Sequence, residues 1–442
     1  MLIMKKAVKF EEIHANGAGI DIGSREIYVS TDGEQVEKFG TYTSDYHACC
    51  KYLKQHGIDS VAMEVTGVYW MSLYAILEQH GIKVCMVHPR EIQQVKGRKT
   101  DVKDSQWIQK LYTAGLLRES IVAEGLLKEL RILTRERMDL IEMGSTYVNK
   151  MQKYLELMNI KLRNVISQIH GESGLRIIRA IIDGEQDPQK LARLCHVSIQ
   201  KNKMEKVIKS LEGNYNKSYI LLLKENLRLW DEHQQSIRYI EQQIAALLEK
   251  MNQNKHIEVT SPSKPARHHN PQIPGLHTTM VQLNNGVNLT TIKGFNDCTM
   301  LRLSGEVGTD VSRFPTVKQF VSWLGLSPKS KQSGKMKKRV KSVSNNAGLI
   351  FRQSAQSLMN SKDSAIGVFI NKLKARKGSK VAIKAGARKL AIAFYNALTK
   401  GIDYVELGTQ KYVEQLKQRE LRLLHQLANK HNFNLSVYEN VM

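Results

Sequence analysis

The chain has 442 residues, which is long enough for two or three domains with hydrophobic cores. It carries 66 Lys and Arg against 42 Asp and Glu, a formal net charge of +24, which predicts a polyanionic partner such as nucleic acid. No stretch has the length of uninterrupted apolar sequence that a membrane span needs, and the opening MLIMKKAVKF lacks the apolar core of a signal peptide. We therefore expect a cytoplasmic or nucleoid protein. Its five cysteines are scattered without a CxxC pair, which argues against zinc and disulfides.

The first 90 residues predict an α/β domain. Short runs of β-branched and apolar residues are separated by glycine, proline and aspartate, a pattern typical of strands and turns. We expect strands at 17–22, 26–31, 35–42, 60–65 and 83–87, a helix at 45–56, and further helices after the fourth and fifth strands. Three successive strands followed by alternating helices and strands predict a mixed sheet.

Two acidic residues lie on the predicted strands. Asp21 stands between Ile20 and Ile22, where burial of a carboxylate is costly unless a cation or hydrogen-bond donors compensate it. Glu64 ends the fourth strand, either as a metal ligand or as a rim carboxylate that caps the next helix.

A second acidic pair, Asp101 and Asp104, opens a predicted helix with Thr100 as its N-cap and an apolar side made of Ile108, Leu111 and Leu116. Because the two acids are three residues apart, they share one helix face. Hard oxygen ligands at this density suit Mg²⁺ or Mn²⁺, although the helix dipole alone also favours an acidic first turn. Four acids from these elements resemble the metal sites of ribonuclease-H-like nucleases, in which two ions grip the attacking and leaving oxygens.

The segments GIDIG, EVTGVYW and KTDVKDSQWIQKL, in this order, resemble the DEDD transposases of the insertion-sequence one-ten family, and most closely its IS-eleven-eleven group. The resemblance covers the N-terminal part of the chain and resumes near residue 290. It implies a ribonuclease-H-like, resolvase-type domain over residues 1–122. Its metal ligands are Asp21, Glu64, Asp101 and Asp104, with Mg²⁺ as the cofactor and Mn²⁺ as the alternative.

Residues 123–258 predict a helical coiled-coil region. Apolar residues recur every seven positions at Ile141, Val148, Leu155, Leu162 and Ile169, with Gly144, Met151, Met158 and Val165 three positions further on. A second run consists of Leu223, Trp230, Ile237, Ile244 and Met251, with Ile240 and Leu247 on the same face. The pattern does not distinguish pairing within one chain from pairing between chains. Because the resembled family uses this region for assembly, we expect a homo-oligomer, either a dimer or a tetramer.

Two less regular segments interrupt the helical region. Residues 171–218 hold helix-like apolar pieces, cut by Gly184 and Pro188, and predict an inserted helical subdomain for which the sequence indicates no chemistry. The apolar residues are Ile177, Ile178, Ile181 and Ile182. Residues 259–274 hold four of the eight prolines and predict a linker. His268 and His269 lie in it without a second ligand group at a suitable spacing, so we expect them to be solvated.

The C-terminal part predicts a mainly α-helical, basic domain over 275–405 and a C-terminal helix over 406–442. Residues 292–296, followed by a helix to Gly308, resemble a helix-hairpin-helix whose turn amides grip a phosphate. Asn296 stands where a second glycine is usual, and asparagine tolerates the left-handed conformation that such a turn needs. From Val311 to Ile402 there are twenty Lys or Arg and one acid, Asp363, an excess of nineteen positive charges. Because the segment also has a core pattern, it predicts a folded phosphate-binding surface.

Ser333 lies in a basic loop, KSKQSGKMKKR, over residues 329–339. A serine beside glycine in such a loop is commonly a phosphate contact or a turn residue, but cations also lower the cost of a serine alkoxide. LGLSPKSKQSGK followed by NNAG and Arg352 resembles the second domain of the same transposase family, which implies that Ser333 is the nucleophile; Ser330 is the competing candidate. The expected nucleic-acid contacts are Lys329, Lys331, Lys335, Lys337, Lys338, Arg339, Lys341 and Arg352.

The sequence therefore predicts a transposase that cleaves and rejoins DNA through a phosphoserine intermediate beside a Mg²⁺-binding acid cluster. The resemblance also implies a noncoding bridge-type guide RNA that delegates sequence choice to base pairing. Two alternatives remain open: a metal-dependent Holliday-junction-type endonuclease that uses water, and a noncatalytic DNA-binding protein.

Overall fold

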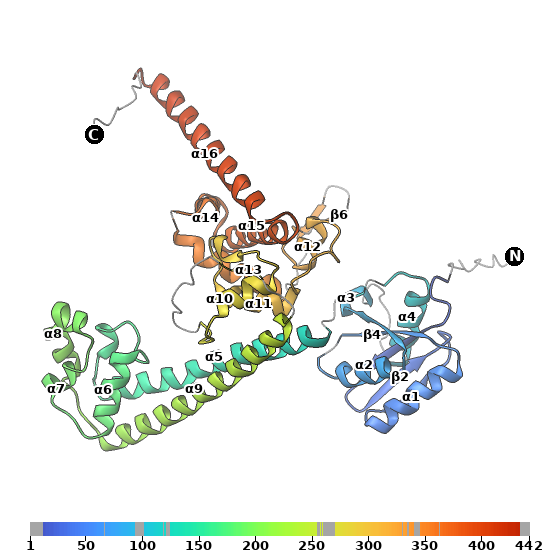
Figure 1. Cartoon of the computed structure of the whole chain (residues 1–442), viewed down its shortest axis with the longest axis horizontal. Helices are drawn as coiled ribbons and strands as arrows, with labels where there is room; N and C mark the ends of the chain where they lie inside the picture. The colour runs from blue at the N-terminus through green and yellow to red at the C-terminus, as the bar shows by residue number, and fades with distance from the viewer. Residues whose placement is uncertain are drawn as a thin grey trace. The chain divides into compact units, whose positions relative to one another are not determined.

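The computed structural model describes residues 12–65, 67–92, 101–117, 119–120, 124–253, 257, 259, 270–328, 330–333, 336–339, 345–361 and 363–433. It divides into two compact units, Met1–Val122 and Ala123–Met442 (Figure 1). None of its helices, as far as they are described, combines the length and the apolar character needed to cross a membrane.

The first unit is built on a five-stranded mixed sheet. The strands are β1 (Gly17–Ile22), β2 (Glu26–Ser30), β3 (Glu37–Gly40), β4 (Ser60–Glu64) and β5 (Lys83–Val87), in the order β3-β2-β1-β4-β5. β2 is antiparallel to β1 and β3, and β4 is parallel to β1 and β5. All five predicted strands are present, and the topology is compatible with the predicted ribonuclease-H-like fold.

Helices cover both faces of this sheet (Figure 1). One face packs the side chains of Ile20, Val61 and Met63 against α1 (Thr43–Gln55) and α2 (Trp70–Gln79). The other face packs Ala62 and Val87 against α4 (Asp101–Thr113), and the short α3 (Pro89–Ile92) precedes that helix. The apolar side predicted for α4 is partly wrong, because Leu116 lies beyond the helix end and is exposed.

The second unit begins with a long helical hairpin. α5 (Gly125–Leu157) and α9 (Lys217–Asn252) lie side by side in Figure 1. They run antiparallel, since Arg137 near the start of α5 pairs with Glu241 late in α9, while Gly144 lies against His233 earlier in α9. The two apolar runs therefore pair within the chain, the first of the two arrangements that the sequence left open.

The tip of the hairpin departs from the predicted seven-residue repeat. α5 ends at Leu157 because Asn159 adopts a left-handed φ of 57°, which an L-residue in a continuing helix cannot have. Leu162 and Ile169 pack instead into a separate core with η1 (Leu162–Asn164), α6 (Glu172–Ile182), α7 (Pro188–Ala192) and α8 (Val197–Leu211). The apolar spacing was right, but its continuation as one helix was wrong.

The remaining elements form a helical body around an aromatic core. Phe320, Phe351 and Phe394 are fully buried and contact one another. The elements are α10 (Leu276–Leu283), η2 (Leu289–Thr291), α11 (Asp297–Val307), α12 (Val317–Trp323), β6 (Ser330–Ser333), β7 (Met336–Arg339), α13 (Asn346–Ser357), η3 (Leu358–Asn360), α14 (Ala365–Lys377), α15 (Ser379–Lys400) and α16 (Ile402–Lys430). Positive φ at Gly378 and Gly401 separates the last three helices.

The predicted turn at 292–296 is present in a different form. Gly294 takes the positive φ of 100°, while Asn296 is extended and accepts a hydrogen bond from the backbone of Thr299 as the N-cap of α11. Asn296 therefore does not use the left-handed conformation that asparagine tolerates, and its side chain caps the helix instead. Thr100 and the histidine pair at 268–269 lie outside the described residues.

Candidate active site and nucleic-acid interface

Two of the predicted acids lie at the carboxyl ends of adjacent parallel strands. Gly19 of β1 is opposite Ala62 of β4, and Ile20 is opposite Met63, so the next pair in this register is Asp21 and Glu64. Residues that are opposite one another in a parallel pair project to the same face. Because Ala62 packs toward α4, Asp21 and Glu64 belong to the face that α4 covers.

The third element, α4, runs antiparallel to β1 at very close range. A Cβ at Gly17 would meet the ring of Tyr112 at 2.7 Å, and a Cβ at Gly19 would meet the backbone of Ser105 and Gln109 at 2.3 Å. Later residues of β1 therefore lie beside earlier residues of α4. The glycines are required here, because any side chain would push the helix off the sheet.

This geometry brings the first turn of α4 over the carboxyl ends of β1 and β4. One helical turn, about 5.4 Å long, spans nearly the same distance as two strand residues, about 6.6 Å. Ser105 lies against Gly19, so the helix residue one turn before Ser105 lies near the strand residue two positions after Gly19. Those positions are Asp101 and Asp21. The same argument applies to β4, because Ile108 of α4 packs with Ala62. Asp104 is one turn before Ile108 and Glu64 is two residues after Ala62, so these two positions also correspond.

The backbone thus brings all four acid positions to one edge of the sheet. Carboxylates gathered in this way are ligands that Mg²⁺ and Mn²⁺ prefer. Among the side chains that are described, a set that excludes Asp101, no three carboxylate, histidine or cysteine groups are close enough to hold one metal ion. The fit to a divalent ion therefore rests on strand register, on helix position and on the chemistry of the ligands.

Ser333 lies on a β-hairpin where the sequence predicted a loop. It ends β6 and is opposite Met336 of β7, and Lys331 is opposite Lys338. Gly334 and Lys335, which connect the strands, lie outside the described residues. Two short strands separated by two residues, of which the first is glycine, are the sequence pattern of a β-hairpin.

Hydrogen bonds join residues on both sides of this β-hairpin in sequence to the helical body. The Nζ of Lys384 on α15 donates to the carbonyl oxygen of Ser327 at 3.4 Å, just before β6. The Nδ2 of Asn345, the N-cap of α13, donates to the carbonyl oxygen of Trp323 at 3.2 Å, just after the hairpin in sequence. Ser327 and Asn345, the described residues with these contacts on either side of the hairpin in sequence, are therefore held to the helical body.

Two regions of the chain match known protein families. Residues 18–160 match a DEDD transposase model of IS110, described as a transposase, and residues 287–366 match the model described as the transposase IS116/IS110/IS902 family. The two matches cover about half of the chain and contain both the acids and Ser333. The chain belongs to the IS110 family of transposases. No curated protein matches the chain.

Most of the DNA contacts predicted for this transposase lie in the least described part of the chain. The side chains of Lys331, Lys337, Lys338 and Arg339 lie outside the description, as do residues Lys329, Lys335 and Lys341 altogether. The strand register still aligns three of these cations with β6 positions: Lys337 with Gln332, Lys338 with Lys331, and Arg339 with Ser330. Arg352 lies on α13, and its Nε is buried without a hydrogen-bond partner in the described part of the transposase.

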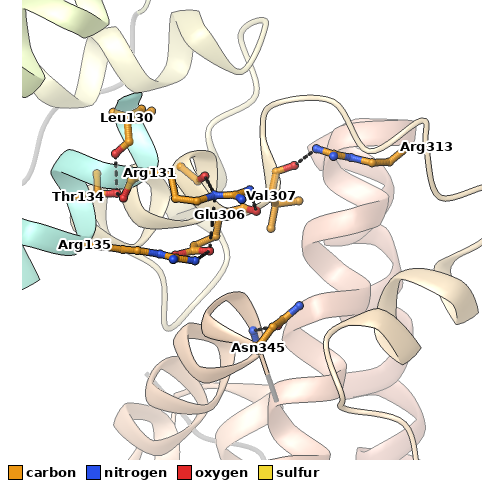
Figure 2. Close-up of polar contacts among 10 residues, drawn as sticks. Leu130, Arg131, Thr134, Arg135, Glu306, Val307, Arg313 and Asn345 are labelled. Atoms are coloured by element: carbon orange, nitrogen blue, oxygen red, sulfur yellow. Dashed lines mark hydrogen bonds and ion pairs between the residues drawn. The ribbon is translucent and has the colours of Figure 1, made fainter. Parts of the chain in front are cut away.

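A brace of arginines, which the sequence analysis missed, joins the hairpin arm of the transposase to its C-terminal body (Figure 2). Arg131 of α5 donates to the carbonyl oxygens of Gly305 and Glu306 at 3.0 and 2.9 Å. Arg135, one turn later, binds the Glu306 carboxylate with two hydrogen bonds of 2.7 and 2.9 Å. Arg313 donates to the carbonyl oxygen of Val307, so guanidinium groups satisfy the open carbonyls at the end of α11.

The charges in this brace respond to burial and to one another. The hydrogen bonds to Glu306 raise the pKa of Arg135, whereas burial lowers the pKa of Arg131 and of Arg313. Glu306 is almost fully buried and compensates two guanidinium groups. The spacing of Arg131 and Arg135 on one helix face was visible in the sequence, but nothing in it connected them to an acid so far along the chain.

Proposed function

We propose that this transposase cuts and rejoins DNA by phosphoryl transfer, with Ser333 as the nucleophile and the four acids as ligands of divalent metal. The observation that carries the proposal is the arrangement at the sheet edge, where the register of β1 and β4 and the close approach of α4 bring Asp21, Glu64, Asp101 and Asp104 together. The match to the DEDD transposase model supports dependence on a divalent metal.

The acids divide into two pairs that suit two metal positions. By the strand register and the helix step, the position of Asp101 corresponds to that of Asp21 after β1 residue Gly19, and the position of Asp104 to that of Glu64 at the end of β4. Bound Mg²⁺, or Mn²⁺, would neutralise charge on the scissile phosphate and its leaving oxygen. The role of the protein here is to keep the carboxylates aligned through the packing of α4 on Gly19.

The proposed covalent step conserves a phosphate ester. The Oγ of Ser333 attacks phosphorus, an Oγ–P bond forms, and the P–O bond to the leaving sugar oxygen breaks. The serine proton leaves to a base or to water, and the leaving oxygen gains a proton. Attack of another DNA hydroxyl on the phosphoserine reverses these events and rejoins the strands, so no external energy source is needed. The basic residues on the hairpin would stabilise the charge of the transition state.

The partners follow from charge and from family resemblance. The excess of nineteen positive charges between Val311 and Ile402 supports DNA binding by the C-terminal body. Resemblance to the family supports a noncoding bridge-type RNA that selects sites by base pairing, and assembly into a dimer or tetramer. Sequencing of nucleic acid that co-purifies with the protein, together with light scattering, tests these partners.

The acid site is tested by neutralising one ligand at a time. We expect Asp101→Asn or Glu64→Gln to reduce Mg²⁺-dependent cleavage about 100-fold or more while DNA retention stays nearly unchanged, because the basic body still holds the phosphates. Asp59→Asn is a matched control, since Asp59 lies before β4 at the opposite edge of the sheet and is exposed. Normal cleavage by either ligand variant would contradict the assignment.

A further inference from the structure

Exposed apolar side chains gather on the two segments that carry or follow the acids. Val68 and Tyr69 are 68% and 51% exposed, Met71 is 37% exposed, and Val102, beside Asp101, is 37% exposed. These are four of the seven large hydrophobic side chains exposed in the described part of the first unit, the others being Ile13, Tyr42 and Leu116. Three of the four, Val68, Tyr69 and Met71, are close neighbours in sequence, and adjacent exposed apolar groups indicate a binding surface.

The turn between β4 and α2 holds two of these side chains outward. Trp70, the first residue of α2, is buried and donates its indole N–H to the carbonyl oxygen of Gly67 at 3.2 Å. Gly67 has a left-handed φ of 58°, and Met71 donates its backbone N–H to Val68 at 3.2 Å. Because Trp70 occupies the core position, the residues just before it, Val68 and Tyr69, remain in solvent.

This turn lies at the carboxyl edge of the sheet, immediately after Glu64. A DNA strand whose phosphate lies at the acids brings its neighbouring bases within reach of the turn, since successive bases of a strand are about 3.4 Å apart. A base offers a flat apolar face, on which an aromatic ring stacks, and an opened base step accepts a branched aliphatic side chain. The occupant that fits both side chains at this place is a nucleobase of the cleaved strand.

We infer that Tyr69 and Val68 hold the base that flanks the scissile phosphate, with Tyr69 stacked on its face and Val68 inserted into the base step. Fixing this nucleotide orients the phosphodiester against the acid cluster. The inference rests on the proposed function, because it places the scissile phosphate at Glu64.

Photocrosslinking tests the contact without requiring catalysis. The full-length protein is bound to duplexes that carry the ends of the insertion sequence, with 5-iodouracil placed at each position in turn. We expect crosslinks to Tyr69, identified by mass spectrometry of the digested adduct, at one or two adjacent nucleotides. A complete scan without a DNA crosslink at Tyr69, or with crosslinks of the cleaved strand only at other residues, would overturn the inference.

Cleavage assays then separate this contact from the proposed chemistry. Tyr69→Ala should reduce cleavage about tenfold or more and abolish the change in fluorescence that binding causes in 2-aminopurine placed beside the cleavage position, while Tyr69→Phe, which still stacks, restores both. The matched control is Tyr239→Ala, because Tyr239 is 60% exposed on α9 in the other unit. Full activity and full fluorescence of Tyr69→Ala would reject the base contact alone, whereas absence of cleavage by the wild-type protein would reject the proposed function.

Discussion

Ser330 and Ser333 share the β6–β7 hairpin but occupy different positions on it. Ser333 is the last residue of β6, next to the connecting glycine, and Ser330 is the first. Because they are three residues apart on a strand, their positions belong to opposite faces of the ribbon. The surrounding charge does not distinguish the two serines, since both belong to the same basic hairpin. They differ in the face of the ribbon to which they belong.

We expect Ser333→Ala to block recombination and to abolish any covalent protein–DNA adduct. Ser330→Ala should cost at most one phosphate hydrogen bond, about 1 kcal/mol of binding free energy. The measurement uses a nicked suicide substrate, denaturing gels and mass spectrometry of the adduct. Efficient cleavage by Ser333→Ala with a free hydrolysed end would instead support the junction-type endonuclease that uses water, and an adduct at Ser330 would reassign the nucleophile.

Gly19 controls the position of α4 and with it the acid cluster. A Cβ there would lie 2.3 Å from backbone atoms of Ser105 and Gln109, which cannot rotate away as a side chain would. We expect Gly19→Ala to lower the free energy of unfolding of the first unit by about 3 kcal/mol and to reduce cleavage. Gly57→Ala, in open space with a φ of 68°, should cost about 1 kcal/mol and leave cleavage unchanged. Urea denaturation and cleavage assays compare the two, and equal effects would contradict the packing argument.

Between elements, the guanidinium brace holds the base of α5 against the end of α11. Glu306 is buried and bound by both Arg131 and Arg135, so its removal leaves two cations without their carboxylate. In addition, Gly305 allows close contact, because a Cβ there would lie 2.9 Å from the hydroxyl oxygen of Thr134. The brace therefore fixes the position of α5, and with it the α5–α9 helical hairpin, relative to the C-terminal helical body.

We expect Glu306→Gln to lower the free energy of unfolding of the second unit by about 2 kcal/mol, because a neutral amide compensates the two arginines poorly. Glu172→Gln is the control, since its pair with Arg176 is exposed and should contribute less than about 0.5 kcal/mol. Thermal unfolding of the full chain, followed by calorimetry, measures both variants. An equally small effect of Glu306→Gln would show that the brace does not stabilise the fold.

For the whole molecule, the location of the charge decides how the protein holds nucleic acid. Nineteen of the +24 net charges arise between Val311 and Ile402. DNA affinity should fall steeply with salt, and replacing Lys337, Lys338 and Arg339 with alanine should flatten the log-log slope by about 0.9 for each duplex phosphate that the variant no longer neutralises. Filter binding across a salt series measures the slope. A shallow slope in the wild-type protein would mean that these charges face solvent and that DNA binds elsewhere.

The sequence by itself determined the strands, the acids and the charge of this transposase. Strand bounds were predictable because Gly and Asp turns separate short apolar runs, and Asp21 stood out because a charge inside such a run is costly to bury. The heptad spacing also located the buried faces of α5 and α9. These features depend on neighbours close in the chain, where local sterics and burial act.

Only the tertiary structure decided which residues meet. The repeat through Leu162 and Ile169 does not continue α5, because the backbone at Asn159 turns left-handed and these side chains complete a separate core. The brace joins Arg131 and Arg135 to Glu306 across more than 170 residues of sequence, and the approach of α4 to β1 depends on Gly19 having no side chain. Such contacts form when elements that are distant in sequence pack against the same buried surface. Residue spacing along the chain does not show which elements will pack together.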